Sequence, residues 1–264
     1  MNKKKILAGL DAGHIHTKAV IMRGEEILGE RTVPTGFDVV DAAQIALNDA
    51  LENAGISRGE LDGIMATGIF KDMMKASPLE VSGTVPEYMA DAKGALFLNH
   101  NSRTVIDIGG NIHKAVGYDQ NGALLDVIQN DKCADGMGIF YTTMSKALEL
   151  SEQELTESAL KSTQNLSIAV QCALSAQSDA IDLISQGHDI SDVADAVSKF
   201  IAERVADMST YMSLTKEIVV AGGLAKSQVI VKHLSRLLKE ELSVLNHPEY
   251  VGAIGAVISY EGGR

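Results

Sequence analysis

Hydrophobic and polar positions follow the same short-period pattern in two parts of the chain. Residues 3–13 and 102–110 are β-branched or apolar runs that close on Asp-x-Gly. In each part polar turn residues, a second apolar run, a glycine-containing turn and a third run come next, the third runs being 26–33 and 123–129. Runs of four to eight residues between turn signals are typical of strands, so each part is predicted to be a β-meander.

The two predicted meanders match residue by residue. The segment LDAGHIHTKAV at 10–20 returns as IDIGGNIHKAV at 106–116, with one offset of 96 for the aspartates (107 − 11) and the lysines (114 − 18). A repeat of this size predicts two similar lobes, each giving one hairpin to a shared cleft. We expect residues 1–100 to form one lobe, with a C-terminal helix at about 251–264 packing back on it, and residues 101–250 to form the other.

Helical spacing of apolar residues follows each meander. It predicts helices over 38–54, with Gly55 as the C′ residue, and over 140–150, 168–185 and 192–212. Residues 215–242 read as a strand, a Gly-Gly turn and an amphipathic helix, and residues 249–260 as a last helix. The expected fold class is therefore α/β.

The amino-acid composition makes some classes of binding partner unexpected. The 264 residues are 45% hydrophobic, which allows more than one core, and carry a net charge of −12. Such a surface repels phosphate backbones and anionic lipid, so we expect neither a nucleic-acid nor a membrane partner. No run approaches the ~20 apolar residues of a membrane span, and Asp11 interrupts the short apolar run near the start. A cytoplasmic protein is expected.

The hairpins carry residues suited to anion binding. A glycine at the tip of each turn lets backbone amides approach an anion without obstruction by a Cβ atom. The strand-end carboxylates of Asp11 and Asp107 suit a hydrated Mg²⁺, which favours one or two carboxylates together with phosphate oxygens. Asp-x-Gly alone is common, so two ordinary hairpins are the simpler alternative, and the shared register is what favours a nucleotide site.

This set of motifs resembles the actin, sugar kinase and Hsp70 ATPase fold over essentially the whole chain. Residues 11–18 and 107–114 resemble the two phosphate motifs, and residues 221–225 resemble the adenosine loop. The resemblance implies two ribonuclease-H-like lobes around a nucleotide cleft that holds ATP or ADP, with Mg²⁺ held through water by the two aspartates. It implies these cofactor-binding residues: Asp11, Gly13, Thr17, Lys18, Asp107, Gly109, Gly110, Lys114, Gly222 and Gly223.

The chain has two cysteines, Cys133 and Cys172. Cys133 lies in the segment NDKCADGMGIF at 130–140, just before a predicted helix, where the helix dipole stabilises a thiolate. Cys172 lies within the helix predicted over 168–185. Because neither belongs to a CxxC pair, the simpler interpretation is that both pack as small buried apolar side chains.

In context, the cysteines carry a more specific resemblance. VIDIGG at 105–110, NDKCADGMG at 130–138 and the second cysteine 39 residues on (172 − 133) resemble the BadF/BadG/BcrA/BcrD type of ATPase. That family contains activators of 2-hydroxyacyl-CoA dehydratases and ATP-hydrolysing subunits of benzoyl-CoA reductase. NHPEYVGAIGA at 246–256 is most similar to the reductase subunits.

The family resemblance implies an electron-transfer role. A [4Fe-4S] cluster usually takes four thiolates, so two subunits, each giving Cys133 and Cys172, would share one cluster. ATP hydrolysis would then drive a low-potential electron from ferredoxin or flavodoxin to a partner iron–sulfur dehydratase or reductase.

Several positions depart from the family pattern. His14 and Ile15 stand where small hydroxyl residues contact phosphate, and Gln177 and Asp179 stand where two glutamates are usual. The predicted catalytic residues are therefore Asp107 and Asp179 as carboxylates, with Gln177 orienting water. The departures suggest a heterodimer with a paralogous ATPase subunit as the alternative to a homodimer. Two other functions stay open: a sugar-type kinase of the same fold, and a nucleotide-binding regulatory subunit without turnover.

Overall fold

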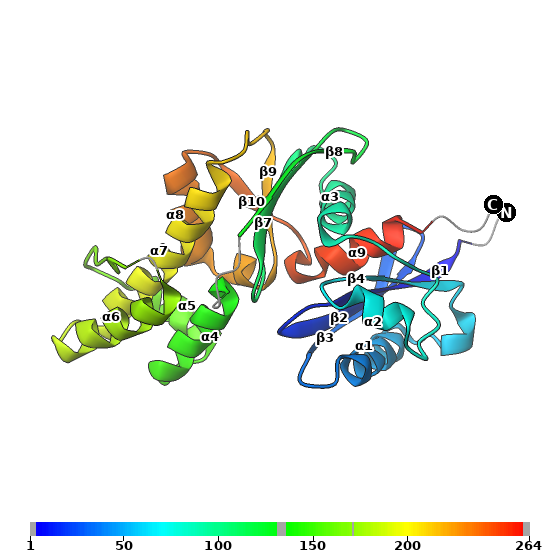
Figure 1. Cartoon of the computed structure of the whole chain (residues 1–264), viewed down its shortest axis with the longest axis horizontal. Helices are drawn as coiled ribbons and strands as arrows, with labels where there is room; N and C mark the ends of the chain where they lie inside the picture. The colour runs from blue at the N-terminus through cyan, green and yellow to red at the C-terminus, as the bar shows by residue number, and fades with distance from the viewer. Residues whose placement is uncertain (1–3, 131–135, 171, 261–264) are drawn as a thin grey trace.

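The computed structural model of the protein describes residues 4–130, 136–170 and 172–260. Two five-stranded sheets lie side by side, and helices pack around and between them (Figure 1). The first has the strand order β3-β2-β1-β4-β5 and the second β10-β9-β6-β7-β8. We call each sheet, with the helices that cover its outer side, the first lobe and the second lobe.

The first sheet confirms the first predicted meander. β1 and β2 pair antiparallel, β2 and β3 also pair antiparallel, and β4 joins β1 in parallel. The first-lobe strands are β1 (Ile6–Ala12), β2 (His16–Arg23), β3 (Glu26–Pro34), β4 (Gly63–Thr67) and β5 (Gly83–Thr84). The lobe's helices are α1 (Val39–Ala54) and the short α2 (Lys71–Lys75). As predicted, α1 ends at Gly55, whose φ of 64° is the left-handed conformation of a C′ glycine.

The second sheet repeats this pattern. The second-lobe strands are β6 (Thr104–Ile108), β7 (His113–Tyr118), β8 (Leu124–Gln129), β9 (Ile218–Ala221) and β10 (Leu242–Val244). Asp107 lies opposite Lys114 in the β6–β7 pair, as Asp11 lies opposite Lys18 in the β1–β2 pair. The sequence repeat is therefore also a repeat of strand register.

Five helices cover the second lobe in the described part of the chain: α4 (Met137–Ala147), α5 (Glu152–Ala159), α6 (Ala173–Ser185), α7 (Ile190–Ser209) and α8 (Gln228–Leu238). The prediction for α6 was wrong at its start, because the helix begins at Ala173 and not at 168. Leu166, Ile168 and Val170 all pack against the second-lobe core. Their alternation has the period of extended chain, so this stretch reaches the core without forming a helical turn.

Two helices lie between the sheets: α3 (Glu87–Leu98) and α9 (Val251–Ile258) (Figure 1). Ala92 and Ala95 of α3 pack on the second sheet, whereas Ala253 and Val257 of α9 pack on the first. Where the two helices cross, Gly255 faces the Ala90 carbonyl so closely that a Cβ atom has no room. The lobes are thus joined through a tight contact of small residues. None of the described helices combines the length and apolar character that a membrane span needs.

Candidate functional site

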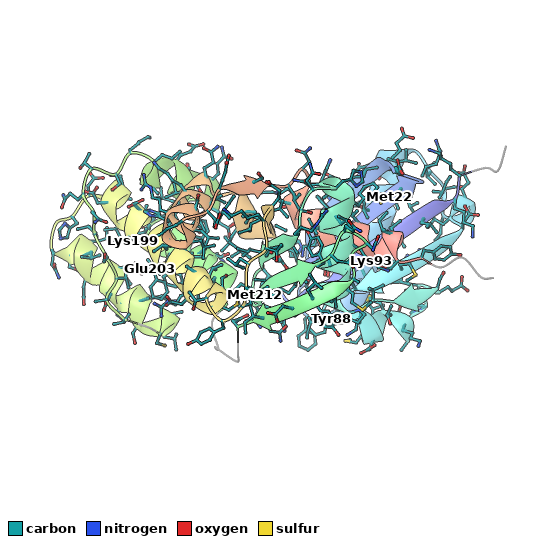
Figure 2. All side chains as sticks on the ribbon, turned by 90° about the horizontal axis from the view of Figure 1, so that it is seen from above. Met22, Tyr88, Lys93, Lys199, Glu203 and Met212 are labelled. Atoms are coloured by element: carbon teal, nitrogen blue, oxygen red, sulfur yellow. The ribbon has the colours of Figure 1, made fainter. Side chains whose placement is uncertain are left out.

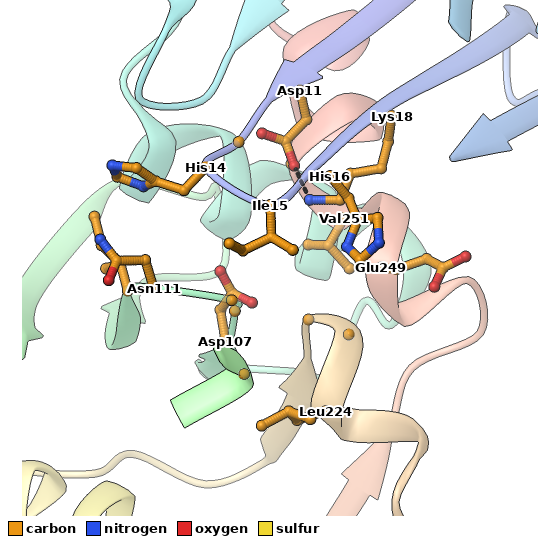
Figure 3. A pocket seen from close by; sticks show the side chains of 18 of the residues that line it. Asp11, His14, Ile15, His16, Lys18, Asp107, Asn111, Leu224, Glu249 and Val251 are labelled. Atoms are coloured by element: carbon orange, nitrogen blue, oxygen red, sulfur yellow. Dashed lines mark hydrogen bonds and ion pairs between the residues drawn. The ribbon is translucent and has the colours of Figure 1, made fainter. Parts of the chain in front are cut away.

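A cavity of about 400 Å³ opens between the two lobes, where β1 and β6 end. The tips of both repeated hairpins line it, and so does the Gly-Gly turn after β9. Figure 3 shows Asp11 and Lys18 on one side of the cavity, Asp107 on the other and Ile15 between them. The two halves of the sequence repeat therefore meet at one site.

Each hairpin holds its aspartate and lysine as an ion pair. Lys18 Nζ donates to Asp11 Oδ2 at 2.8 Å, and Lys114 Nζ lies 2.8 Å from Asp107 Oδ2. Burial alone would lower the pKa of Lys18, but the Asp11 and Asp107 carboxylates together outweigh burial and raise it. The site thus presents two fixed cations beside two carboxylates, which suits a polyanion that arrives with a divalent cation.

Lys114 has further partners on α3. Its Nζ lies 3.0 Å from Asp91 Oδ2 and 3.9 Å from Glu87 Oε2. Burial opposes its charge, yet Asp107, Asp91 and Glu87 together hold the pKa of Lys114 well above its usual value. Burial raises the pKa of Asp91 to about 8, and burial also raises the pKa of Glu87. One lysine therefore faces three carboxylates, one of which favours its protonated form at neutral pH.

Glu87 and Asp91 were not predicted from the sequence, although both line the cavity. No motif surrounds them, and their link to Lys114 joins two elements that are distant in the chain. One signal was available: two carboxylates stand four residues apart on a helix otherwise rich in alanine and apolar residues. That spacing puts both on one face, which is unusual for a face packed against a core.

Gly222 fits the site because only glycine can occupy its position. Its φ is 88°, and a Cβ atom there would overlap Asp107 Oδ1 and the Ile108 carbonyl oxygen. The Gly222 amide donates to the Pro248 carbonyl at 2.8 Å. The turn after β9 is thereby held against the second hairpin, with Gly223 also lining the cavity.

Nine of the ten predicted cofactor-binding residues line the cavity: Asp11, Gly13, Lys18, Asp107, Gly109, Gly110, Lys114, Gly222 and Gly223. Thr17 is not among the lining residues, because its side chain is fully buried. Its Oγ1 lies 2.9 Å from Thr35 Oγ1, and Thr35 Oγ1 donates to the Gly13 carbonyl at 2.8 Å. Thr17 therefore supports the shape of the first hairpin from behind.

Gln177 and Asp179 also lie away from the cavity. Both belong to α6, which packs against α4 and α7 at the outer end of the second lobe (Figure 1). The structure does not bring them together with Asp107. Two other carboxylates line the cavity in addition to those on α3, namely Glu152 at the start of α5 and Glu249 before α9.

Glu152 and Glu249 contribute to the cavity wall together with polar neighbours, and Glu249 lies beside the first meander, where its Oε1 accepts a hydrogen bond from Thr32 Oγ1 at 3.5 Å. Thr142 Oγ1 donates to Glu152 Oε1 at 2.5 Å, and Lys226 forms an ion pair with Glu249. Carboxylate oxygens accept hydrogen bonds from hydroxyl groups, and hydroxyl side chains both donate and accept them. This wall therefore has the chemistry to hold a sugar.

Cys172 is exposed and caps the N-terminus of α6, so its interpretation as a buried apolar side chain was wrong. Cys133, the other predicted cluster ligand, lies outside the described residues. No three His, Cys, Asp or Glu side chains of the described chain come together as a metal-binding group. A cluster held by this chain therefore needs ligands beyond those that the described part supplies.

Comparison with known proteins agrees with this geometry. A model of the BadF/BadG/BcrA/BcrD ATPase family matches residues 8–259. The activator of lactoyl-CoA dehydratase from Anaerotignum propionicum is 31% identical over 258 residues, which cover 97% of this chain and 98% of that protein.

Solved structures give the same result. Component A of (R)-2-hydroxyglutaryl-CoA dehydratase from Acidaminococcus fermentans superposes with a TM-score of 0.89 at 29% identity, over 96% of both chains. The activator of 2-hydroxyisocaproyl-CoA dehydratase from Clostridium difficile, with bound ADPNP, gives a TM-score of 0.88 at 30% identity, over 95% of this chain and 92% of that one. A ROK-family glucokinase from Streptomyces griseus, with a TM-score of 0.61 and 14% identity, shares the fold alone. The predicted two-lobed ATPase fold is confirmed.

Proposed function

Because the chain belongs to the BadF/BadG/BcrA/BcrD ATPase family, we propose that it is an ATP-dependent activator of a partner enzyme. It hydrolyses ATP and passes a low-potential electron, through a [4Fe-4S] cluster shared by two subunits, to an iron–sulfur acyl-CoA dehydratase or a benzoyl-CoA reductase-type enzyme. Ferredoxin or flavodoxin supplies the electron. The second subunit is a copy of this chain or a paralogous ATPase subunit.

One observation carries the ATPase part of the proposal. The Asp11–Lys18 and Asp107–Lys114 pairs face one cavity from opposite lobes in the same register. A triphosphate needs cations and backbone amides on both sides of its chain of phosphates, and the two hairpins supply them. The wall at Glu152 and Glu249 then suits the ribose.

The residues also fit a magnesium ion. Asp11 and Asp107 both line the cavity, and both are already paired with lysine, so contact through water suits them better than direct ligation. The ion, when bound with ATP, neutralises charge on the phosphate oxygens. The chain's own part is to place the two carboxylates on opposite sides of the phosphates.

Glu87 is the residue we assign to the attacking water. It is half-buried at the start of α3, lines the cavity and has its carboxylate 3.9 Å from Lys114 Nζ. A carboxylate in this position accepts a hydrogen bond from water and takes up its proton as the water oxygen bonds to the γ-phosphorus, the bond to the bridging oxygen breaks and ADP leaves. Burial raises the pKa of Asp91, and Lys114 lines the cavity, where its ammonium group can stabilise charge on the phosphate.

Cys172 fits a cluster shared between subunits. Its thiol is exposed at the N-cap position of the 13-residue α6, where a second subunit has access to it. Cys133, which precedes α4 in the sequence and lies outside the described residues, is the proposed second ligand from each chain. A bound cluster supplies a one-electron carrier. Helix α6 then transmits motion of the second lobe to the cluster at the interface between the two subunits.

Anaerobic purification with iron quantitation tests the proposal. We expect brown protein with about four irons per two chains, together with ATP hydrolysis that depends on magnesium. Cys172→Ser removes the iron, whereas Ser175→Ala, a change at an exposed residue of the same helix, retains it.

Other results would contradict this function. Iron-free protein after careful reconstitution would remove the electron-transfer role. Transfer of the γ-phosphoryl group to an added sugar would indicate the kinase alternative. Nucleotide binding without turnover and without iron would indicate a regulatory subunit. Iron bound only when a paralogous subunit is present would select the heterodimer.

A further inference from the structure

A second cavity, of about 470 Å³, lies within the second lobe and shares no lining residue with the cavity between the lobes. Its walls are the C-terminal end of α5, the loop 160–165, and facing sides of α7 and α8. Figure 2 shows Lys199, which lines it, at the opposite end of the molecule from Met22 of the first sheet. A volume between about 300 and 1,000 Å³ is usual for small-molecule sites.

Three lysine and arginine side chains line this second cavity: Lys199 from α7, and Lys232 and Arg236 from α8. Lys232 and Arg236 are one helical turn apart and exposed, and neither forms an ion pair or hydrogen bond to another described residue. Like charges at this spacing repel one another. On a chain with a net charge of −12 this is a local concentration of unpaired positive charge.

The acidic groups nearby balance only part of that charge. Asp195 is the one carboxylate among the described lining residues, and its Oδ1 lies 2.8 Å from His233 Nε2. Lys199 Nζ donates to neutral oxygens, at 2.9 Å to Asn165 Oδ1 and 2.7 Å to Ser167 Oγ. Glu203, labelled beside Lys199 in Figure 2, does not line the cavity.

The loop that forms the facing wall is fixed before any ligand arrives. Asp192, which is buried, accepts hydrogen bonds at Oδ1 from the Thr163 amide at 2.7 Å, the Gln164 amide at 2.9 Å and Ser162 Oγ at 2.9 Å. The hydroxyl and amide side chains of 162–165 therefore form a rigid polar wall in the same cavity as the cations. This wall can form hydrogen bonds with the other polar groups of a ligand without the entropic cost of ordering the loop.

From this arrangement we propose that the second cavity binds the phosphoryl group of a small polar molecule. Lys232 and Arg236 hold the phosphoryl oxygens from α8, and Lys199 approaches from α7. A doubly charged group with three equivalent oxygens matches three cations, whereas a carboxylate leaves most of their charge unpaired. The phosphoryl group belongs to free phosphate or to a phosphate ester, and the site is independent of the activator function proposed above.

Isothermal titration calorimetry tests this proposal with the nucleotide cavity filled. The full chain is first saturated with magnesium and adenosine β,γ-imidotriphosphate, then titrated at constant ionic strength with inorganic phosphate, with glycerol 3-phosphate, or with acetate. We expect one phosphate or ester per chain and at least tenfold weaker binding of acetate. Lys232→Gln combined with Arg236→Gln weakens phosphate binding at least tenfold, or about 1.4 kcal/mol. Lys75→Gln combined with Lys146→Gln, an equal loss of two charges at exposed residues that do not line this cavity, leaves it within twofold.

Each outcome has a consequence. Tighter binding of the ester identifies a phosphorylated metabolite as the ligand, and tighter binding of inorganic phosphate identifies the free ion. No phosphate binding to the unmodified chain overturns the proposal, as does equal binding by the doubly substituted chain. Acetate binding as tight as phosphate binding also overturns the proposal, because it shows only general attraction between opposite charges. Circular dichroism and thermal unfolding confirm that the variant is folded, as expected for two exposed positions.

Discussion

Lys114 stands between three carboxylates, and its surroundings show how single side chains set the chemistry of the site. Asp107 shares its hairpin, whereas Glu87 and Asp91 reach it from α3. Because the lysine is only 5% exposed, its charge must be balanced by these neighbours and cannot be balanced by water. Changing any one of the three carboxylates is therefore expected to alter the protonation of the other two.

Glu87 gives the sharpest prediction at this scale. Glu87→Gln is expected to lower the turnover number for ATP hydrolysis by about 10²–10⁴, because the amide cannot take the proton from water. Nucleotide affinity, measured by calorimetry, should change little. Burial raises the pKa of Glu87, so hydrolysis should fall with decreasing pH at a higher pH than for an ordinary glutamate.

The Glu87→Gln variant should not show this loss of hydrolysis with decreasing pH, which is the acidic limb of the pH profile. Glu152→Gln is the matched comparison on the other wall of the same cavity. It is expected to raise the Michaelis constant and to keep the acidic limb. An unchanged turnover number in Glu87→Gln would contradict the role assigned to Glu87.

His113 predicts how stability depends on pH. Burial lowers its pKa from 6.5 to about 4, and Asp107 offsets only part of that effect. Between these pH values the unfolded chain binds a proton that the folded chain does not bind. The free energy of unfolding therefore falls as the pH falls, by up to about 3 kcal/mol when the pH is below 4.

Urea unfolding of the wild type and of His113→Leu at pH 7 and pH 4.5 isolates this contribution. The stability difference between the two proteins should shift in favour of the variant at the lower pH. Stability differences that stay constant over this range would contradict the assignment. Titrating groups distant from His113 affect both proteins alike, so they cancel in the comparison.

Single residues also show how far the sequence could be followed. Asp11, Lys18, Asp107 and Lys114 were predictable, because each pair is local and strand register brings its members together. Glu87 and Asp91 depend on how α3 packs on the second sheet, which a local pattern does not encode. The inward position of the Thr17 side chain, by contrast, follows from a local pattern. Strand alternation turns this side chain toward Thr35 and away from the cavity.

At the scale of elements, the contact between α3 and α9 is the most constrained. Gly94 faces the Val251 carbonyl and Gly255 faces the Ala90 carbonyl. Small residues on both helices let their backbones approach closely, which leaves no space for larger side chains. The two lobes can therefore move relative to one another only by small sliding or rotation at this crossing.

Gly255→Val tests that constraint. We expect it to lower the free energy of unfolding by about 3 kcal/mol, because overpacking forces α3 and α9 apart. Gly252→Ala on the same helix is the control, since the nearest atoms to its added Cβ lie at an ordinary 3.5 Å or more. That control should be neutral or slightly stabilising, by about 0.5 kcal/mol. Equal unfolding midpoints for both variants in urea would show that the crossing tolerates bulk.

One helix boundary could be predicted from the local sequence pattern and another could not. The end of α1 was predictable, because Gly55 has the left-handed conformation that marks a helix end. The start of α6 was not, because residues 166–170 have apolar positions compatible with more than one period. Packing of Ile168 into the second-lobe core decides the matter in favour of extended chain.

At the scale of the whole molecule, the repeated hairpin was the decisive sequence signal. It predicted two lobes and a shared cavity, and the strand orders and the cavity lining agree with it. The second cavity had no such signal, because its cations come from two helices, α7 and α8, and its polar wall comes from a loop of the second lobe. Such a site becomes visible only when those elements are placed together in space.

Metal removal gives a prediction for the assembly. If two chains share one cluster through exposed Cys172, an iron chelator should convert an anaerobic dimer to monomers. Size-exclusion chromatography with light scattering measures the mass before and after chelation. Cys172→Ser should be monomeric from the start, while Ser175→Ala should behave as the wild type. A dimer that survives complete loss of iron would place the subunit contact elsewhere.

The position of α9 has a consequence for how the protein is made. This helix covers Val20 and Met22 of the first sheet, although the ribosome synthesises it after the entire second lobe. The nascent first lobe therefore keeps an apolar face bare throughout most of translation, and such a face invites aggregation or chaperone binding. Folding of the earliest strands is completed by one of the latest segments to emerge.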